Sequence, residues 1–568
     1  MTHSKTRIRI ISLAVVFVAA LFCVRLYYLQ VIKHRDFVKL ADRQYVKNSG
    51  ASFDRGTIFF ESKDGDLVSA ATLKTGYTIA INPKILQNPE EVYTKINEVF
   101  PIEKEEFIRK ADKKTDPYEE MAKRVPEEFA DKITALKIPG VSLYKEDWRY
   151  YPGGKSASQL LGLIAYKDDD LAGRYGLERQ YENVLGRNAE DVYANFFVEI
   201  FSNIKKSTLQ GEEAEGDIVA TIEPTVQSEL EKTIKEIQEK WNSAETGAII
   251  IDPKTGEIYA MGALPNFDPN DFSGEKNVSV FSNPLVEEVR EMGSIIKPLT
   301  VASGLDAGVI SANTTYNDSG SVTLNTETIY NFDKKGRGQI TLQTALANSL
   351  NTGMVFIMQK LGRDRFTDYF YKFGLGEKTR VDLPNEAQSI VTNLESPRDI
   401  EHATASFGQG IALTPFATVR ALSVLANGGV LITPHVVKEI QYKSGFKKTL
   451  EFPEPKRVIS KEASDEITRM MVNVVDTTLL DGKAKNPHYT VAAKTGTAQI
   501  AKPGGGGYYE DRYLHSFVGY FPAYEPRFLV FIYTVYPKGV SFAANTLANP
   551  FLKISKFLLS YYDIAPDR

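Results

Sequence analysis

The chain has 568 residues, which is more than a single hydrophobic core usually organises, so two or three domains are expected. Hydrophobic residues make up 43% and charged residues 25%, a composition typical of a chain that folds mostly in water. A formal net charge of -4 provides no general attraction to nucleic acid, and no nucleic-acid partner is expected.

The cysteine and histidine content argues against a metal enzyme. The single cysteine, Cys23, can form neither an intramolecular disulfide nor a cysteine zinc site. The six histidines are scattered, and no pair has the helical spacing of a zinc motif. Neither a metal nor another cofactor is therefore expected.

The first element is an apolar run from Ile8 to Val24 in which Arg9 is the only charged residue. Its length is close to the lower limit for a membrane span, about 17 to 25 residues, and it contains no clear cleavage site. We expect residues 1–30 to form a short cytoplasmic tail and an uncleaved transmembrane signal anchor rather than a buried helix of a soluble domain. Basic residues flank both ends of the run, so charge alone does not fix its orientation.

A mixed α/β region without a catalytic constellation is predicted for residues 31–222. Short β-rich runs such as Tyr77–Ile81 alternate there with charged helical stretches such as Glu90–Phe100 and Glu103–Lys113. Ile218–Ile222 reads as a short strand at the end of this region. We interpret the region as a non-catalytic pedestal domain.

A linker helix follows, since Pro224 opens the strongly helical stretch Thr225–Trp241 and proline is well tolerated in a first helical turn. Residues 223–245 are therefore assigned to this linker. The pattern then changes to a β-hairpin, in which Gly247–Asp252 and Ile258–Met261 flank a turn. A second domain is predicted to begin at residue 246 and to extend to residue 568.

Within residues 246–568, helical segments are enclosed by strands from both ends of the domain, an order that favours a single antiparallel sheet with helices packed on it, and hence an α+β fold. The predicted helices are Leu299–Leu305, Thr341–Leu361, Pro415–Ala426, Ala463–Asp476 and a last one from about Pro550 to Tyr561. The predicted strands after the hairpin are Thr490–Ala493, Phe517–Phe521 and Phe528–Val535, with a loop at Gly504–Gly507.

Three short motifs in this domain carry the chemistry. Serine acyltransferases that act on penicillin have Ser-x-x-Lys, Ser-x-Asn and Lys-Thr-Gly in this chain order. Each pattern also occurs elsewhere in the chain, so only order and context select a set. That set is Ser294-Ile-Ile-Lys297, Ser349-Leu-Asn351 and Lys494-Thr495-Gly496-Thr497.

The residue types suit nucleophilic catalysis. Ser294 and Lys297 are three residues apart on one helix face, and the amine can take the hydroxyl proton if burial and a neighbouring ammonium lower its pKa. Lys494 provides that second ammonium, and Pro298 places the pair at a helix start. Gly496 is expected to leave a strand edge bare for an extended peptide, and the backbone N–H groups of Ser294 and Thr497 to form an oxyanion hole.

A structural interpretation exists for each motif alone. Ser294 could cap a helix, Ser349 and Asn351 could satisfy backbone groups, and the Lys-Thr-Gly segment could be a turn. The ordered trio within one predicted domain favours catalysis instead. A Ser-His-Asp hydrolase is disfavoured because the chain contains no Gly-x-Ser-x-Gly elbow.

With these motifs in place, the sequence resembles a class B penicillin-binding protein over nearly its whole length, and the stretch Asn283–Thr300 is most similar to the septal, division-specific branch of that family. Further segments that resemble family motifs are Arg55–Ile58, Arg149–Pro152, Gly176–Tyr181, Leu185–Gly186, Phe407–Gly410, Thr414–Pro415 and Ala426–Gly429.

The resemblance implies a peptidoglycan D,D-transpeptidase that cross-links stem peptides through a Ser294 acyl-enzyme, releases terminal D-Ala and is inhibited covalently by β-lactams. It implies that Lys297 is the base, that Ser349 relays a proton, that Asn351 binds the peptide amide, and that Thr495 and Thr497 hold the terminal carboxylate.

The resemblance also implies a location and partners. The enzyme would be a single-pass protein of the cytoplasmic membrane with its catalytic domain outside. A membrane glycan polymerase and other division proteins are the expected partners. The alternatives are a D,D-carboxypeptidase or β-lactamase of the same fold, and a non-catalytic division scaffold.

Overall fold

The structure is a computed structural model that describes residues 53–167, 170–187, 215–504 and 506–568. The predicted anchor at Ile8–Val24 lies outside the described residues. Among the helices that are described, none combines the length and the apolar character needed to cross a bilayer. The chain divides into two compact units, and their described parts are residues 53–54 with 73–148, and residues 55–72 with 149–187 and 215–568.

The smaller unit is a sheet covered by short amphipathic helices. The second half of β3 (Leu67–Ile81) pairs with β4 (Glu119–Val125) in antiparallel fashion. The other elements are α3 (Pro89–Val99), α4 (Lys104–Ala111), α5 (Glu127–Ala135) and most of β5 (Val141–Tyr150). Its own apolar core contains Ile79, Ile96 and Phe107, which are almost completely buried.

The larger unit begins with a small sheet around a buried ion cluster. Strand β2 (Ile58–Glu61) pairs with β9 (Gly216–Ala220), which in turn pairs with β17 (Val437–Tyr442). Close by, the guanidinium groups of Arg55 and Arg149 each lie 2.6 Å from the fully buried carboxylate of Glu178. The short elements of this part are α6 (Ser158–Leu161), β6 (Ile164–Lys167), β7 (Asp170–Gly173), α7 (Gly176–Gln180) and α8 (Glu182–Leu185).

The main sheet of the larger unit has five antiparallel strands in the order β11-β10-β22-β21-β20. The strands are β10 (Glu245–Ile251), β11 (Ile258–Leu264), β20 (Ala492–Ala501), β21 (Tyr508–Phe521) and β22 (Phe528–Val535). The single antiparallel sheet predicted from the sequence is thereby confirmed. Strand β20, which carries the third motif, is an edge strand.

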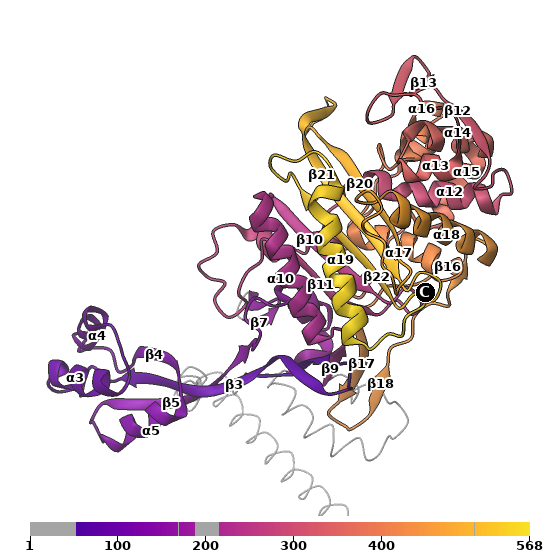
Figure 1. Cartoon of the computed structure of the whole chain (residues 1–568). Helices are drawn as coiled ribbons and strands as arrows, with labels where there is room; N and C mark the ends of the chain where they lie inside the picture. Colours follow the sequence, from indigo (N-terminus) through magenta and orange to yellow (C-terminus); the bar gives the residue numbers. More distant parts are fainter. Residues whose placement is uncertain (1–52, 168–169, 188–214, 505) are drawn as a thin grey trace, which may run out of the picture. The chain divides into compact units, whose positions relative to one another are not determined.

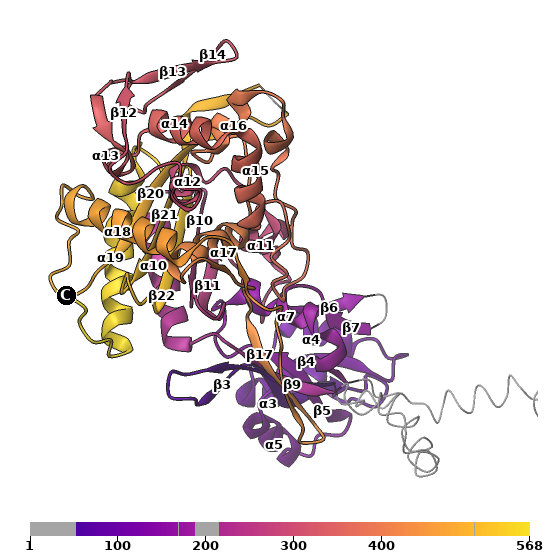
Figure 2. The ribbon, with the colours of Figure 1, turned by 90° about the vertical axis from the view of Figure 1, so that its right-hand side faces the viewer.

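Helices cover both faces of this sheet (Figures 1 and 2). On one face, α10 (Pro224–Trp241) and α19 (Ala543–Tyr561) pack on Ile250 and Ile532. On the other face, the neighbouring strand residues join the core of the remaining helices. The main ones are α12 (Lys297–Asp306), α13 (Leu342–Ala347), α14 (Asn351–Leu361), α15 (Arg363–Lys372), α16 (Asp399–Ala405), α17 (Pro415–Ala426) and α18 (Lys461–Thr477).

Two predicted helices differ from the structure. Thr341–Leu361 was predicted as one helix but is divided into α13 and α14, because Ser349 between them has a left-handed backbone, φ +55°. The last helix was predicted to begin near Pro550, but α19 begins at Ala543 and contains Pro550. The hairpin β10–β11, helix α17 and strand β22 were predicted correctly.

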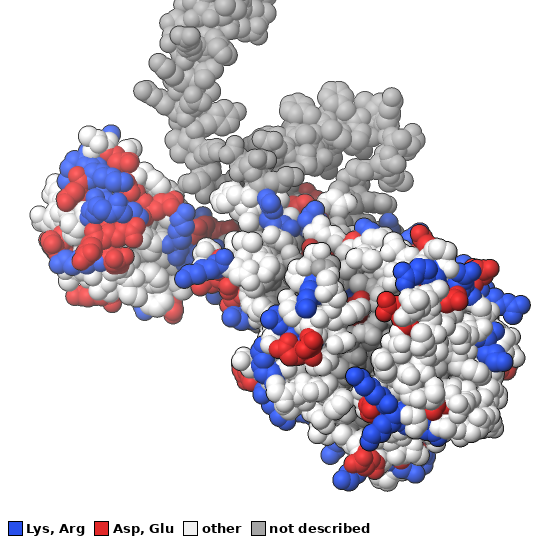
Figure 3. Space-filling model, turned by 90° about the horizontal axis from the view of Figure 1, so that it is seen from above, with Lys and Arg blue, Asp and Glu red and all other residues white. Residues whose placement is uncertain are grey.

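The surface has no large region of one charge on the face turned to the viewer in Figure 3, where lysines and arginines alternate with acidic residues between broad uncharged areas. This distribution agrees with the nearly balanced composition, 68 basic against 72 acidic residues.

Candidate active site

Ser294 lies in the tight turn that opens helix α12. The turn is the 3-10 helix η3 (Gly293–Ile296), which continues directly into α12, where Pro298 occupies the first helical turn. Ser294 is half-buried, and its hydroxyl has no hydrogen-bond partner within the part of the chain that the structure describes. The predicted position of Ser294 at a helix start is confirmed, and its role as the nucleophile stays a prediction.

The turn that carries Ser294 lies close to the edge strand β20, and two glycines permit this close approach. A Cβ at Gly293, where φ is +63°, would lie 2.8 Å from the carbonyl oxygen of Thr497. A Cβ at Gly496 would lie 2.8 Å from the carbonyl oxygen of Met292 and 2.3 Å from the Ser516 hydroxyl. Gly496 therefore permits the close contact between β20 and the turn that carries Ser294, and the bare strand edge expected from the sequence stays a prediction.

The side chains of the three motifs meet at Ser349. The Nζ atom of Lys297 donates to the Ser349 carbonyl at 2.5 Å and to the Ser349 hydroxyl at 3.2 Å. Lys494 donates to the same hydroxyl at 2.9 Å, and to the carbonyl of Thr495 at 2.9 Å. One hydroxyl thus links two amines that lie 197 residues apart in the sequence.

Both amines are buried, and no carboxylate pairs with either of them among the described residues. Burial, and after it the nearby charge of Lys494, hold the pKa of Lys297 well below its usual range. Burial alone lowers the pKa of Lys494 to about 7. Burial thus favours the uncharged form of Lys297 beside a second buried amine, as a general base with a neighbouring lysine requires.

The substrate-binding candidates surround this centre. Asn351 is the first residue of α14, and its amide donates to the carbonyl of Tyr330 at 2.9 Å. Thr495 and Thr497 are half-buried on β20, and the Thr497 hydroxyl accepts a bond from the backbone N–H of Ala543 at 3.3 Å. The eight predicted site residues thus lie on η3, on α12, in the turn between α13 and α14, at the start of α14 and on one edge strand. The predicted oxyanion hole stays a prediction.

Two residues outside the predicted site fix the turn in place. Ser516 on β21, directly opposite Gly496, donates its hydroxyl to the Met292 carbonyl at 2.8 Å. The backbone N–H of Gly293 donates to the carbonyl of Gly408 at 3.1 Å. The sequence signals for this support are the glycine immediately before Ser294 and the segment Phe407–Gly410, which contains Gly408. Ser516 becomes a neighbour of the turn through the fold alone.

Comparison with family models gives two matches. Residues 246–554 match the penicillin binding protein transpeptidase domain, and residues 54–195 match the penicillin-binding protein dimerisation domain. The first match contains all eight candidate site residues, and the two matches fall within the predicted catalytic and pedestal ranges.

Similar proteins cover most of the chain. Stage V sporulation protein D of Bacillus subtilis is 30% identical, over 96% of this chain and 84% of that protein. The peptidoglycan D,D-transpeptidase FtsI of Escherichia coli is 28% identical, over 79% of this chain and 73% of that protein.

Solved structures share the fold. Penicillin binding protein 2X from Streptococcus thermophilus superposes with a TM-score of 0.73 at 22% identity, covering 90% of this chain and 81% of that one. Penicillin binding protein 3 from Mycobacterium tuberculosis, complexed with aztreonam, has a TM-score of 0.69 at 22% identity, covering 91% of this chain and 98% of that one.

Proposed function

The chain belongs to the class B penicillin-binding proteins, which are peptidoglycan D,D-transpeptidases and targets of β-lactams, and from that premise we propose the residues with which it performs this reaction. Ser294 is the nucleophile, Lys297 is its base, and Ser349 and Lys494 complete the proton path. The observation that carries this assignment is the Ser349 hydroxyl that links two buried amines beside the nucleophile turn.

In the acylation step, the Ser294 oxygen attacks the carbonyl carbon of the penultimate D-Ala of a stem peptide, and its proton passes to the neutral amine of Lys297. The bond from that carbon to the nitrogen of the terminal D-Ala then breaks. The leaving nitrogen takes a proton through the Ser349 hydroxyl, which Lys494 can resupply. Terminal D-Ala departs as a neutral amine, and Ser294 carries the acyl group.

In the transfer step, the amine of a second stem peptide attacks the ester carbon of the acyl-enzyme. The path runs in reverse: the attacking nitrogen loses a proton through the Ser349 hydroxyl to Lys494, and Lys297 returns a proton to the Ser294 oxygen when the ester bond breaks. A new amide bond joins the two strands of peptidoglycan.

The donor peptide is proposed to lie along β20 as an added strand. Asn351 would contact its amide, and Thr495 and Thr497 would hold the terminal carboxylate near the Lys494 ammonium. The position of β20 at the edge of the sheet and the location of Asn351 at the start of α14 support this arrangement.

We further propose a single-pass anchor within residues 1–30, a catalytic domain outside the cytoplasmic membrane, and a role in septal wall synthesis beside a membrane glycan polymerase. The apolar run Ile8–Val24 supports the anchor, and the similarity of Asn283–Thr300 to the septal branch supports the role. Depletion of the protein is expected to give cells that elongate without dividing. Normal division after depletion would exclude the septal role and leave the transpeptidase assignment intact.

A fluorescent penicillin tests the assignment of the nucleophile. The wild-type protein is expected to bind one label per chain and to retain it for many minutes, while Ser294→Ala binds none. Rapid turnover of the penicillin would point to a β-lactamase instead, and release of D-Ala without cross-linking to a carboxypeptidase. Cells that still cross-link their wall with only the alanine variant would show that the protein acts as a scaffold.

A further inference from the structure

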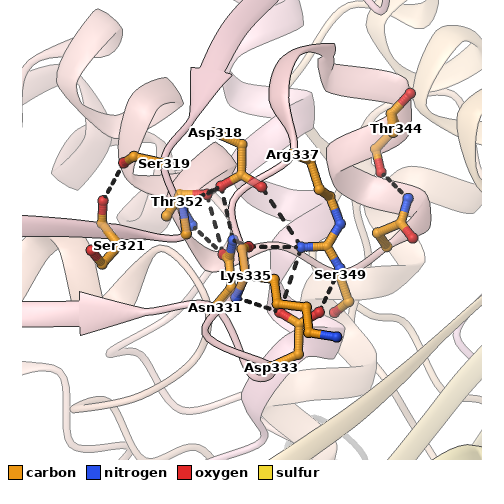
Figure 4. A network of polar contacts seen from close by, with 12 residues as sticks. Asp318, Ser319, Ser321, Asn331, Asp333, Lys335, Arg337, Thr344, Ser349 and Thr352 are labelled. Atoms are coloured by element: carbon orange, nitrogen blue, oxygen red, sulfur yellow. Dashed lines mark hydrogen bonds and ion pairs between the residues drawn. The ribbon is translucent and has the colours of Figure 1, made fainter.

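A buried polar cluster lies behind the second motif, outside the set of reacting groups (Figure 4). It joins Asp318 at the end of β12 (Thr315–Asp318), Asn331 just after β14 (Glu327–Tyr330), and Thr352, the second residue of α14. All three side chains are almost completely buried. The segments come together only in the fold, since 34 residues separate Asp318 from Thr352.

Asp318 is the centre of the cluster. Its Oδ1 atom accepts bonds from the Thr352 hydroxyl at 2.8 Å, the Asn331 amide at 2.8 Å and the backbone N–H of Gly320 at 3.1 Å. Its Oδ2 atom accepts no hydrogen bond from the described residues and lies 3.7 Å from a guanidinium nitrogen of Arg337. The Asp318 carboxylate is thus fixed in position by three hydrogen-bond donors and the nearby guanidinium group of Arg337.

The cluster also holds the backbone at the start of α14. The Asn331 side-chain oxygen accepts the backbone N–H of Thr352 at 3.2 Å, and the preceding carbonyl, that of Tyr330, accepts the amide of Asn351 at 2.9 Å. Two successive residues at the end of β14, Tyr330 and Asn331, therefore hold the first two residues of the helix. Ser349, with its left-handed backbone, lies immediately before this clamped segment.

This long-range support compensates for a missing local cap. Helices are usually capped by a Ser, Thr, Asp or Asn at the N-cap position, whose side chain accepts an N–H of the first turn. In α14 the N-cap residue is Leu350, whose side chain cannot accept a hydrogen bond. The polar residues on either side of it, Ser349 and Asn351, face other partners. Asn331 supplies the acceptor instead, which leaves both motif side chains available for the reaction.

We propose that Asp318, Asn331 and Thr352 are positioning residues that hold Ser349 and Asn351 in their reactive arrangement by anchoring the start of α14. The proposal rests on the catalytic role proposed for Ser349. A strained backbone persists only where its surroundings fix it, and this cluster provides that constraint beside Ser349. Asp318, Asn331 and Thr352 act through Ser349 and Asn351 and do not themselves contact the substrate or the reacting atoms.

The test uses Thr352→Val, which deletes the hydroxyl and keeps the branched shape, with Thr352→Ser as the conservative partner that keeps the hydroxyl. A stability control is Thr418→Val on α17, which removes a buried hydroxyl that bonds only within its own helix, to Thr414. Full-length protein in detergent is acylated with a fluorescent penicillin, and the acylation rate constant and the prior dissociation constant are measured separately at a temperature where each variant is folded.

The expected result is that Thr352→Val lowers the acylation rate constant at least tenfold, with less than a threefold change in the dissociation constant. Thr352→Ser should stay within threefold of wild type, and Thr418→Val should lower only the melting temperature. Equal acylation by wild type and Thr352→Val would overturn the proposal, and so would equal losses in the valine and serine variants. Failure of wild type itself to label would instead refute the proposed function.

If Thr352→Val does not fold, Arg337→Gln replaces it, because Arg337 is at the partly exposed rim of the cluster. Its loss removes the cation beside Asp318 and the 2.9 Å ion pair with Asp333. A threefold or greater loss in the acylation rate constant at an unchanged dissociation constant is expected, and an unchanged rate constant would contradict the proposal.

Discussion

Replacing Ser349 with glycine or alanine separates the chemical role of its hydroxyl from the strain of its backbone. Both changes delete the oxygen to which the amines of Lys297 and Lys494 donate. Loss of a group that relays protons is expected to slow acylation by about 10² to 10⁴-fold, and equally in both variants.

The two variants should differ in stability. A left-handed backbone, here φ +55°, costs an L-residue about 1–2 kcal/mol, and glycine avoids most of this cost. Glycine also gains freedom in the unfolded chain, which reduces its advantage by about 0.4–1 kcal/mol. We therefore expect Ser349→Gly to be more stable than Ser349→Ala by about 1 kcal/mol, although neither variant is active.

The assay pairs denaturant unfolding, followed by tryptophan fluorescence, with the rate of labelling by a fluorescent penicillin. Labelling of either variant at more than a tenth of the wild-type rate would refute the relay role of the hydroxyl. A glycine variant that is less stable than the alanine variant would refute the assignment of strain to Ser349.

Three further predictions follow from the packing and the charges. Gly496→Ala places a Cβ 2.8 Å from the Met292 carbonyl, so it should cost about 1–3 kcal/mol of unfolding free energy and slow labelling, as thermal unfolding and penicillin binding will measure. The rate of penicillin acylation, measured as a function of pH, should increase as Lys297 loses its proton. It should decrease again as Lys494, whose pKa is about 7, becomes neutral. A rate that keeps rising to about pH 9 would contradict these roles. Glu178→Ala leaves the buried Arg149 without its carboxylate and Arg55 with Glu182 alone, and should cost about 3–5 kcal/mol in urea unfolding. An unchanged midpoint would show that the cluster adds nothing to stability.

Regular elements were predictable where local signals agree with the fold. Helix α17 was correct to the residue because Thr414 caps it, Pro415 begins it and Gly428 follows it closely. Strand β22 is a nearly continuous apolar run whose side chains are buried on both faces of the sheet. Its two ends were also predicted correctly.

The division of Thr341–Leu361 was not predictable from local sequence. No glycine or proline stands at Ser349 itself, and the weak helix formers around it, Asn348, Asn351 and Gly353, do not fix where one helix ends and the next begins. The break is stabilised by contacts with distant residues, namely the two lysines and the cluster around Asp318. Sequence reasoning found the reacting residues by their motif order, but it could not find the residues that hold them in place.

The measurement that tests the central claim most directly is the mass of the acylated tryptic peptide. Because trypsin does not cleave before Pro298, Ser294 falls in the peptide from Glu291 to Lys334, whereas Ser349 falls in the peptide from Gly338 to Lys360. Wild-type protein treated with penicillin should carry the added mass only on the first peptide, at Ser294. Added mass on the second peptide, or persistence of the label in Ser294→Ala, would contradict the assignment of the nucleophile.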